Sequence, residues 1–157
     1  MGIVVNQSIK NTIITFIGFA IGAINTLFMY THFLGEDYYG LTTVLLSSAN
    51  ILMPLMAFGI QNTLVKFYTA YETDAEKSKF LNLVLVLPLV IVLPIFLILV
   101  LYYSEIASQV SQVNPIIFDY VWIIPVIGLF MGYFEIFYAW VKVHLKSVFG
   151  NFVKEVL

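Results

Sequence analysis

Glu135 interrupts an otherwise apolar stretch near the end of the chain. An acid inside a membrane segment must face protein or water, and it can carry a proton or a cation. Glu135 is therefore a candidate for a substrate or ion path, with pairing to a nearby lysine or contact with lipid headgroups as the structural alternative. Asn25 and Asn50 lie in other apolar stretches, where their amides either line the same path or form hydrogen bonds between helices.

The chain lacks the residue patterns of soluble enzymes. His32 and His144 are predicted at opposite membrane faces, which excludes a metal site shared by the two. No serine has a histidine and an acid in register, no glycine-rich phosphate loop is present, and the adjacent Glu36 and Asp37 suit a solvated turn. The chain has no cysteine, so thiol chemistry is also excluded. We predict that the protein is not an enzyme and that it holds neither a cofactor nor a metal.

The elements that position these candidate residues are predicted to be apolar helices. Of the 157 residues, 61% are hydrophobic and 10% are charged, and the mean hydropathy is +0.98, outside the range of soluble domains. A helix of about 20 apolar residues crosses the hydrocarbon core of a bilayer. The sequence therefore predicts an all-α, polytopic membrane helix bundle that occupies residues 1–141, with four transmembrane helices at 11–33, 41–65, 80–103 and 119–141.

All seven basic residues are lysines, and they occur only in alternate segments that flank the predicted spans. One precedes the first span, three lie around the link between the second and third, and three follow the fourth: Lys10; Lys66, Lys77 and Lys79; Lys142, Lys146 and Lys154. The two remaining links contain none. The positive-inside rule assigns the lysine-bearing links to the cytoplasm, which predicts a multi-pass protein with both termini cytoplasmic. Because the lysines lie at the membrane edge, no nucleic acid partner is predicted.

The tail, residues 142–157, has a different pattern. Its lysines point away from a stripe of apolar residues that recur at helical spacing. The stripe consists of Leu145, Phe149, Phe152 and Val156. Such a stripe predicts a C-terminal amphipathic helix in the cytoplasmic interface of the bilayer. No glycine or proline stop signal follows it, so we expect the tail to lead toward a fifth span.

Prolines and paired glycines are the backbone features of the spans. Each proline removes a donor and frees a carbonyl, so four are candidates for hinges or for static kinks: Pro54, Pro88, Pro94 and Pro125. Two GxxxG pairs let helix backbones approach closely, either inside the bundle or at a dimer face: Gly18 with Gly22, and Gly128 with Gly132.

The link between the first two spans resembles a known signature. Leu34-Gly35 followed by Tyr39-Gly40-Leu41 is similar to the LGxxxYG motif of polysaccharide-lipid flippases, which belong to the multidrug/oligosaccharidyl-lipid/polysaccharide exporter superfamily. Gly59, seven residues before Lys66-Phe67, is similar to the family's glycine that precedes a basic-aromatic helix end. The resemblance extends over about residues 5–145, and its most specific part is 34–67.

The resemblance implies a transporter that moves undecaprenyl-diphosphate-linked oligosaccharides across the bacterial cytoplasmic (inner) membrane for O-antigen, capsule or exopolysaccharide synthesis. Such proteins have twelve to fourteen helices, so we expect this chain to be the N-terminal part of one, partnered by the remainder of the transporter and coupled to H+ or Na+. Family cavities carry basic residues that meet the diphosphate, and none is predicted at depth here. The alternatives are a multidrug or peptidoglycan-precursor exporter and a non-transporting membrane assembly subunit.

Overall fold

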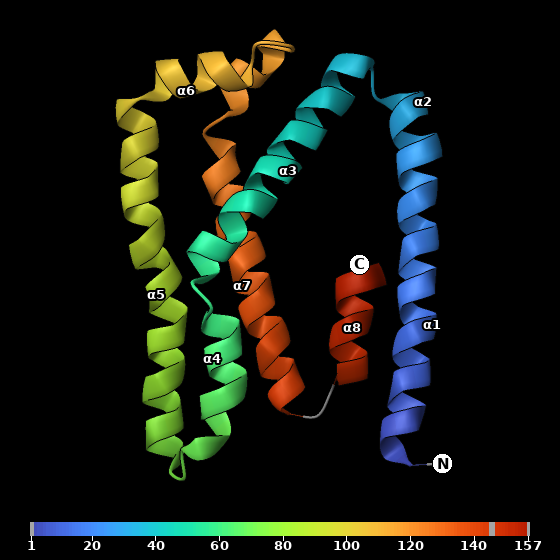
Figure 1. Cartoon of the computed structure of the whole chain (residues 1–157), viewed down its shortest axis with the longest axis vertical. Coiled ribbons are helices and arrows are strands. Elements are labelled where there is room, and N and C mark those ends of the chain that lie inside the picture. Colours follow the sequence, from blue (N-terminus) through green and yellow to red (C-terminus); the bar gives the residue numbers. More distant parts are fainter. Residues whose placement is uncertain (1, 145–146, 157) are drawn as a thin grey trace.

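The structure is a computed structural model that describes residues 2–144 and 147–156 (Figure 1). These residues form helices and connecting turns, and no strand occurs among them. Four helices are long and apolar enough to cross a membrane: Val5–Phe33, Glu36–Ala57, Asp74–Leu101 and Ile123–Val143. The prediction of an all-α bundle with four membrane helices is confirmed.

The first span is one long helix with a widened turn. α1 (Ile3–Ile24) continues through the π-helical turn η1 (Asn25–Tyr30) into α2 (Thr31–Phe33). Its most apolar window is not buried by other described residues. The main packing partner of α1 is α8 (Ser147–Val156), which runs beside it in Figure 1.

The second span is broken, unlike the continuous helix predicted over 41–65. α3 (Glu36–Ala57) begins five residues earlier than predicted, and α4 (Ile60–Phe67) resumes after a two-residue interruption. Phe58 and Gly59 have φ angles of 45° and 70°, and this left-handed backbone cannot continue a right-handed helix. The Phe58 N–H donates to the Pro54 carbonyl at 3.0 Å, while the Gly59 carbonyl accepts from the Asn62 N–H at 3.1 Å. The break is therefore hydrogen-bonded on both sides.

Most of the lysines lie at one end of the bundle, which we call the lysine-bearing end. The third span begins there, after a short turn. After η2 (Tyr68–Ala70), α5 (Asp74–Leu101) begins with a capping box between Thr73 and Glu76. α5 passes Pro88 and Pro94 without a break. Pro88 has no N–H, so the carbonyl of Val84, four residues earlier, has no helical donor. The Tyr133 hydroxyl donates to the next carbonyl, that of Leu85, at 2.6 Å. Tyr133 thus ties the proline-containing stretch of α5 to the fourth span.

The link between the third and fourth spans contains two short helices. α6 (Tyr103–Val110) and η3 (Pro115–Tyr120) lie across the end of the bundle opposite the lysine-bearing end (Figure 1). Asn114 accepts a hydrogen bond from the Ile116 N–H at 3.2 Å and donates one to the Asp37 carbonyl at 2.6 Å. A Cβ on Gly40 would lie 3.3 Å from Asn114 Nδ2. The absence of a side chain at Gly40 therefore leaves space for this link.

The fourth span, α7 (Ile123–Val143), is the centre of the bundle and packs on α3, α4 and α5. It begins four residues later than predicted because η3 occupies residues 115–120. Two apolar clusters surround it: Leu41, Leu45, Ala49, Leu99, Ala107, Ile117, Val121 and Ile124 in one, and Ile60, Leu64, Val84, Ile136 and Ala139 in the other. The core therefore joins spans two, three and four.

The tail contains the C-terminal helix predicted within residues 142–157. Residues 142 and 143 end α7, and α8 then turns back and runs beside α1 (Figure 1). Gly150 is buried against the fourth span, where a Cβ would lie 3.0 Å from the Tyr138 ring. This close approach places α8 between α7 and α1. Leu145 and Lys146, to which the prediction also applied, lie outside the described residues.

Candidate functional site between the first, fourth and last helices

A partly exposed ion pair joins α7 to α8. Lys154 Nζ lies 2.7 Å from Glu135 Oε1, and the two side chains are 35% and 21% exposed. Glu135 is eight residues before the end of α7, which is about 12 Å along a helix. Because α8 turns back, it carries Lys154 to the depth of Glu135. Glu135 therefore pairs with a lysine, which was the structural alternative for this residue. A role of Glu135 in ion coupling stays a prediction.

Tyr138 reinforces this contact. Lys154 Nζ lies 4.9 Å from the centre of the Tyr138 ring, and Lys142 Nζ lies 4.0 Å from it. An ammonium group over an aromatic ring is attracted by the ring's negative face. Glu135 and Tyr138 are on the same face of α7, one turn apart, so both hold the same lysine of α8.

A neighbouring face of α8 contacts α1. A Cβ on Gly18 would overlap the backbone carbonyl of Glu155, whereas one on Gly22 would meet no atom within 4 Å. Asn151 Nδ2 donates to the Asn11 carbonyl at 3.1 Å and to Thr15 Oγ1 at 3.3 Å. Of the first GxxxG pair, Gly18 therefore permits the close approach of α8, and Gly22 is open.

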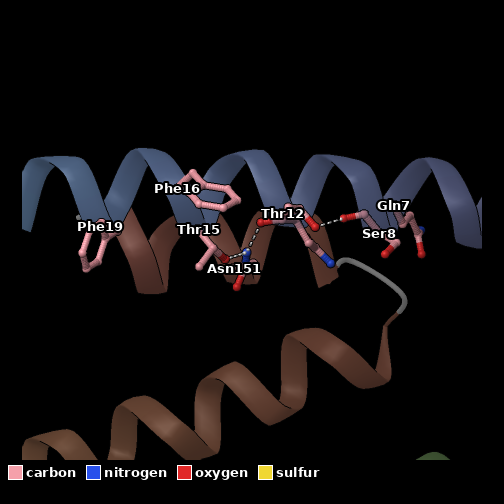
Figure 2. Close-up of a pocket in the computed structure, with 8 residues that line it drawn as sticks. Gln7, Ser8, Thr12, Thr15, Phe16, Phe19 and Asn151 are labelled. Carbon is pink, nitrogen blue, oxygen red and sulfur yellow. Dashed lines mark hydrogen bonds between the residues drawn. The ribbon is translucent and has the colours of Figure 1, made fainter.

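A groove of about 710 Å³ lies along α1 next to this contact (Figure 2). Eight residues line it: Gln7, Ser8, Asn11, Thr12, Thr15, Phe16 and Phe19 of α1, and Asn151 of α8. The Thr12 hydroxyl donates to the Ser8 carbonyl at 3.0 Å, and the buried Asn11 Oδ1 has no hydrogen-bond partner among the described atoms. The polar lining consists of amides and hydroxyls and carries no charge.

A second cavity, of about 380 Å³, lies between α3, α5 and α7. Apart from Ser48, its lining is apolar, with Ile51, Leu52 and Leu99 among the residues. Such a lining suits hydrocarbon and offers little to a polar ligand. Of these two cavities, the α1 groove is therefore the one that suits a polar ligand.

The three candidates for a substrate or ion path are not brought together at the groove. Asn25 begins the π turn η1 and is exposed, and Asn50 is exposed on α3. Neither these two residues nor Glu135 lines the groove.

The four prolines have different surroundings. Pro54 lies in the last turn of α3, just before the break, and Pro94 is exposed on α5. Pro88 is buried in α5, and Pro125 is buried in the first turn of α7. A proline in a first turn removes an N–H that the helix would leave unpaired in any case, so Pro125 does not break the fourth span.

The second pair of glycines lies where α7 meets α3. A Cβ on Gly128 would be 3.3 Å from the Ala49 carbonyl oxygen, and one on Gly132 would be 3.5 Å from the Ala57 nitrogen. Both distances show that the two backbones run close together. This contact is internal to the described bundle.

The residues that carry the family resemblance lie at structural transitions of span two. Gly35 caps the start of α3, and the Tyr39 ring lies 6.3 Å from the Tyr30 ring, centre to centre. Gly40 faces Asn114, and Gly59 forms the break. Lys66 lies in the last turn of α4, with Nζ 5.3 Å from the centre of the Phe67 ring.

The groove, the pairing of Lys154 and the link made by Asn114 were not among the predictions from the sequence. For the groove a signal was present, because Ser8, Asn11, Thr12 and Thr15 recur three or four residues apart and share one helix face. The sequence held no signal for the pairing of Lys154, since the depth of this residue in the bundle depends on the direction in which α8 runs after α7. Within residues 2–144 and 147–156, no group of three His, Asp or Glu side chains is placed to hold a metal ion.

Comparisons with protein-family models, with curated proteins and with solved structures find no match to this chain.

Proposed function

We propose that this chain is the N-terminal part of a flippase that moves undecaprenyl-diphosphate-linked oligosaccharide across the bacterial cytoplasmic membrane for polysaccharide synthesis. Its lysine-bearing end would face the cytoplasm, as the positive-inside rule predicts. The proposal rests on the resemblance at residues 34–67, and one structural observation supports it most directly.

That observation is the break in span two at Phe58 and Gly59. Non-helical backbone at membrane depth is tolerated where protein covers it or where it lines a water-filled cavity. Transporters use such broken helices beside their substrate and ion sites. Gly59, with φ at 70°, is also the glycine that the resemblance singles out. Just past it, the buried Gln61 Oε1 has no hydrogen-bond partner among the described atoms.

Two further features support transport over a purely structural role. Polar side chains of α1 line the groove, and an ion pair joins α7 to α8 about 12 Å from the end of α7. Polar and ionised groups are expensive inside a membrane, so they are a default sign of a substrate or ion pathway. A subunit that served assembly alone would need neither feature.

The test is a lipid-flipping assay in proteoliposomes that contain the protein. A fluorescent undecaprenyl-diphosphate oligosaccharide is placed in both leaflets, and dithionite, which cannot cross the membrane, bleaches the outer one. A flippase exposes the inner pool, so the bleached fraction rises above the share of the outer leaflet. A fraction that stays at this share, with the protein folded, contradicts the proposal.

A matched pair of glycine variants links the assay to the break. Gly59→Ala places a side chain at a positive φ, whereas Gly22→Ala, inside α1 with no atom within 4 Å, is unstrained. We expect Gly59→Ala to slow flipping and Gly22→Ala to leave it unchanged. Parallel assays with a lipid-linked peptidoglycan precursor and with a hydrophobic cation would identify the related exporters if either were moved faster.

A further inference from the structure

We propose that the groove along α1 binds the uncharged sugar residues of a glycan, and that it disfavours phosphate and acidic sugars. The inference rests on the proposed function, because it assigns part of the substrate to a place in the chain. It follows from four properties of the groove: its polarity within a membrane span, its unused hydrogen-bonding atoms, its aromatic rings and its lack of charge.

Polar residues follow one face of α1 through two turns. Ser8, Asn11, Thr12 and Thr15 all line the groove, and Gln7 extends the same face toward the N-terminus. Burying an amide or a hydroxyl in hydrocarbon without a hydrogen bond costs several kcal/mol. A groove with this lining must therefore hold water or a polar ligand rather than lipid tails.

The lining offers hydrogen-bonding atoms that the fold leaves unused. Asn11 Oδ1 is buried, and it has no partner among the described atoms. The Asn151 amide is already oriented toward the groove face by Asn11 and Thr15 (Figure 2). The Asn151 amide uses both of its N–H groups on Asn11 and Thr15. A ligand rich in hydroxyls can therefore accept from the Gln7 amide and, once the Asn11 side chain shifts to expose its free oxygen, donate to Asn11.

Two aromatic rings lie beside these polar groups. Phe16 is 70% exposed and Phe19 is 76% exposed, and both rings project from α1 along the groove (Figure 2). Sugar rings have apolar C–H faces that pack on aromatic rings, while their hydroxyls point outward to amides and hydroxyls. The volume of about 710 Å³ is in the range of ligand pockets, about 300–1,000 Å³.

Charge decides which part of a lipid-linked glycan fits. None of the eight lining residues is charged, so a diphosphate or a uronic acid would lose its hydration without gaining a counterion. Lys154 does not line the groove and instead reaches α7, where it pairs with Glu135. The groove therefore favours uncharged sugars and leaves the anionic group to other residues.

The absence of cysteine from the chain allows a direct test by labelling. Thr12→Cys and Thr15→Cys variants of the whole chain are prepared in lipid nanodiscs and treated with a hydrophilic maleimide. We expect both cysteines to react, and we expect the neutral trisaccharide chitotriose to suppress most of the labelling. Inorganic pyrophosphate and trigalacturonate are expected to leave the labelling rate unchanged.

Substitution of Asn11 tests the assignment at a single residue. Asn11→Leu, in the Thr12→Cys background, removes the free acceptor, and we expect about tenfold more chitotriose for half-protection, the equivalent of one hydrogen bond. Asn82→Leu, at an exposed position of α5, is the matched control and is expected to have no effect. Thr43→Cys, exposed on α3 near the opposite end, is expected to react without protection by the sugar.

Three results would overturn the inference. The first is that Thr12→Cys and Thr15→Cys resist labelling as strongly as Leu93→Cys, whose position on α5 is 66% exposed and is expected to face lipid. The second is that chitotriose protects neither cysteine, and the third is that pyrophosphate protects equally well. Flipping without sugar protection refutes the glycan site alone, whereas protection without flipping refutes the proposed function alone.

Discussion

Lys154 Nζ lies 2.7 Å from Glu135 Oε1, although the two residues belong to helices that run in opposite directions. The charge pattern of the sequence assigned every lysine to the membrane edge. The turn after α7 changes this for Lys154, because α8 runs back along α1. Lys154 therefore lies between α7 and α8 at the depth of Glu135, partly exposed, paired with an acid and packed on the Tyr138 ring.

Removal of either partner of this pair is expected to destabilise the bundle. Lys154→Gln leaves the Glu135 carboxylate without its cation, and Glu135→Gln leaves the ammonium without its anion. Since both side chains are partly exposed, we expect a coupling energy of about 1 kcal/mol in a double-mutant cycle. Thermal unfolding of the four proteins in detergent micelles measures it.

The charge-swapped protein, Glu135→Lys with Lys154→Glu, is the control for this prediction. It restores an ion pair between α7 and α8, so its unfolding temperature should exceed those of the two single swaps. Single and double variants with equal unfolding temperatures would show that the pair contributes nothing.

Gly18 is expected to be necessary for the seating of α8 on α1. Gly18→Val would push its side chain into the backbone of Glu155, whereas Gly22→Val meets no atom within 4 Å. The readout is an oxidative cross-link between Thr15→Cys and Asn151→Cys, whose native side chains are hydrogen-bonded at 3.3 Å. We expect Gly18→Val to abolish the cross-link and Gly22→Val to preserve it; equal cross-linking in both would mean that α8 does not approach α1 at Gly18.

The same substitution is expected to have opposite effects at two phenylalanines. Phe58 is 71% exposed and has φ at 45°, so Phe58→Gly should relieve strain and stabilise the protein by about 1 kcal/mol. Phe130 is 69% exposed but lies inside α7, so Phe130→Gly should destabilise it by about 1 kcal/mol. Unfolding of both variants in denaturant gives the signs; destabilisation by both would argue against strain at Phe58.

Gly128 is expected to set the distance between α3 and α7. A Cβ there would already lie 3.3 Å from both the Ala49 carbonyl oxygen and Met56 Sδ, so Gly128→Leu has no room for its side chain. We expect a loss of about 2 kcal/mol, typical of overpacked interiors. Gly22→Leu, on the open face of α1, is the control in the same unfolding measurement, and a loss of similar size there would attribute the effect to leucine itself.

The spans could be predicted from the sequence because each depends on a local run of apolar residues. A helix satisfies its own backbone hydrogen bonds, so hydropathy over about 20 residues is enough to place it in a membrane. The ends were less accurate, and α7 begins at Ile123 because η3 precedes it. The break after Ala57 was missed, since Pro54 and Gly59 marked a weak point without showing that Phe58 would also adopt a left-handed backbone.

The sequence by itself determined the class of the protein: four apolar helices, with the lysines in alternate links. The flippase resemblance also comes from the sequence alone, and it stays a proposal. The depth of Lys154 and the groove beside Asn11 were decided by the tertiary structure, because each depends on α8 turning back between α7 and α1. Residues that are 19 positions apart in the ion pair and 140 apart in the contact of Asn151 with Asn11 meet through packing, which hydropathy and spacing along one helix do not encode.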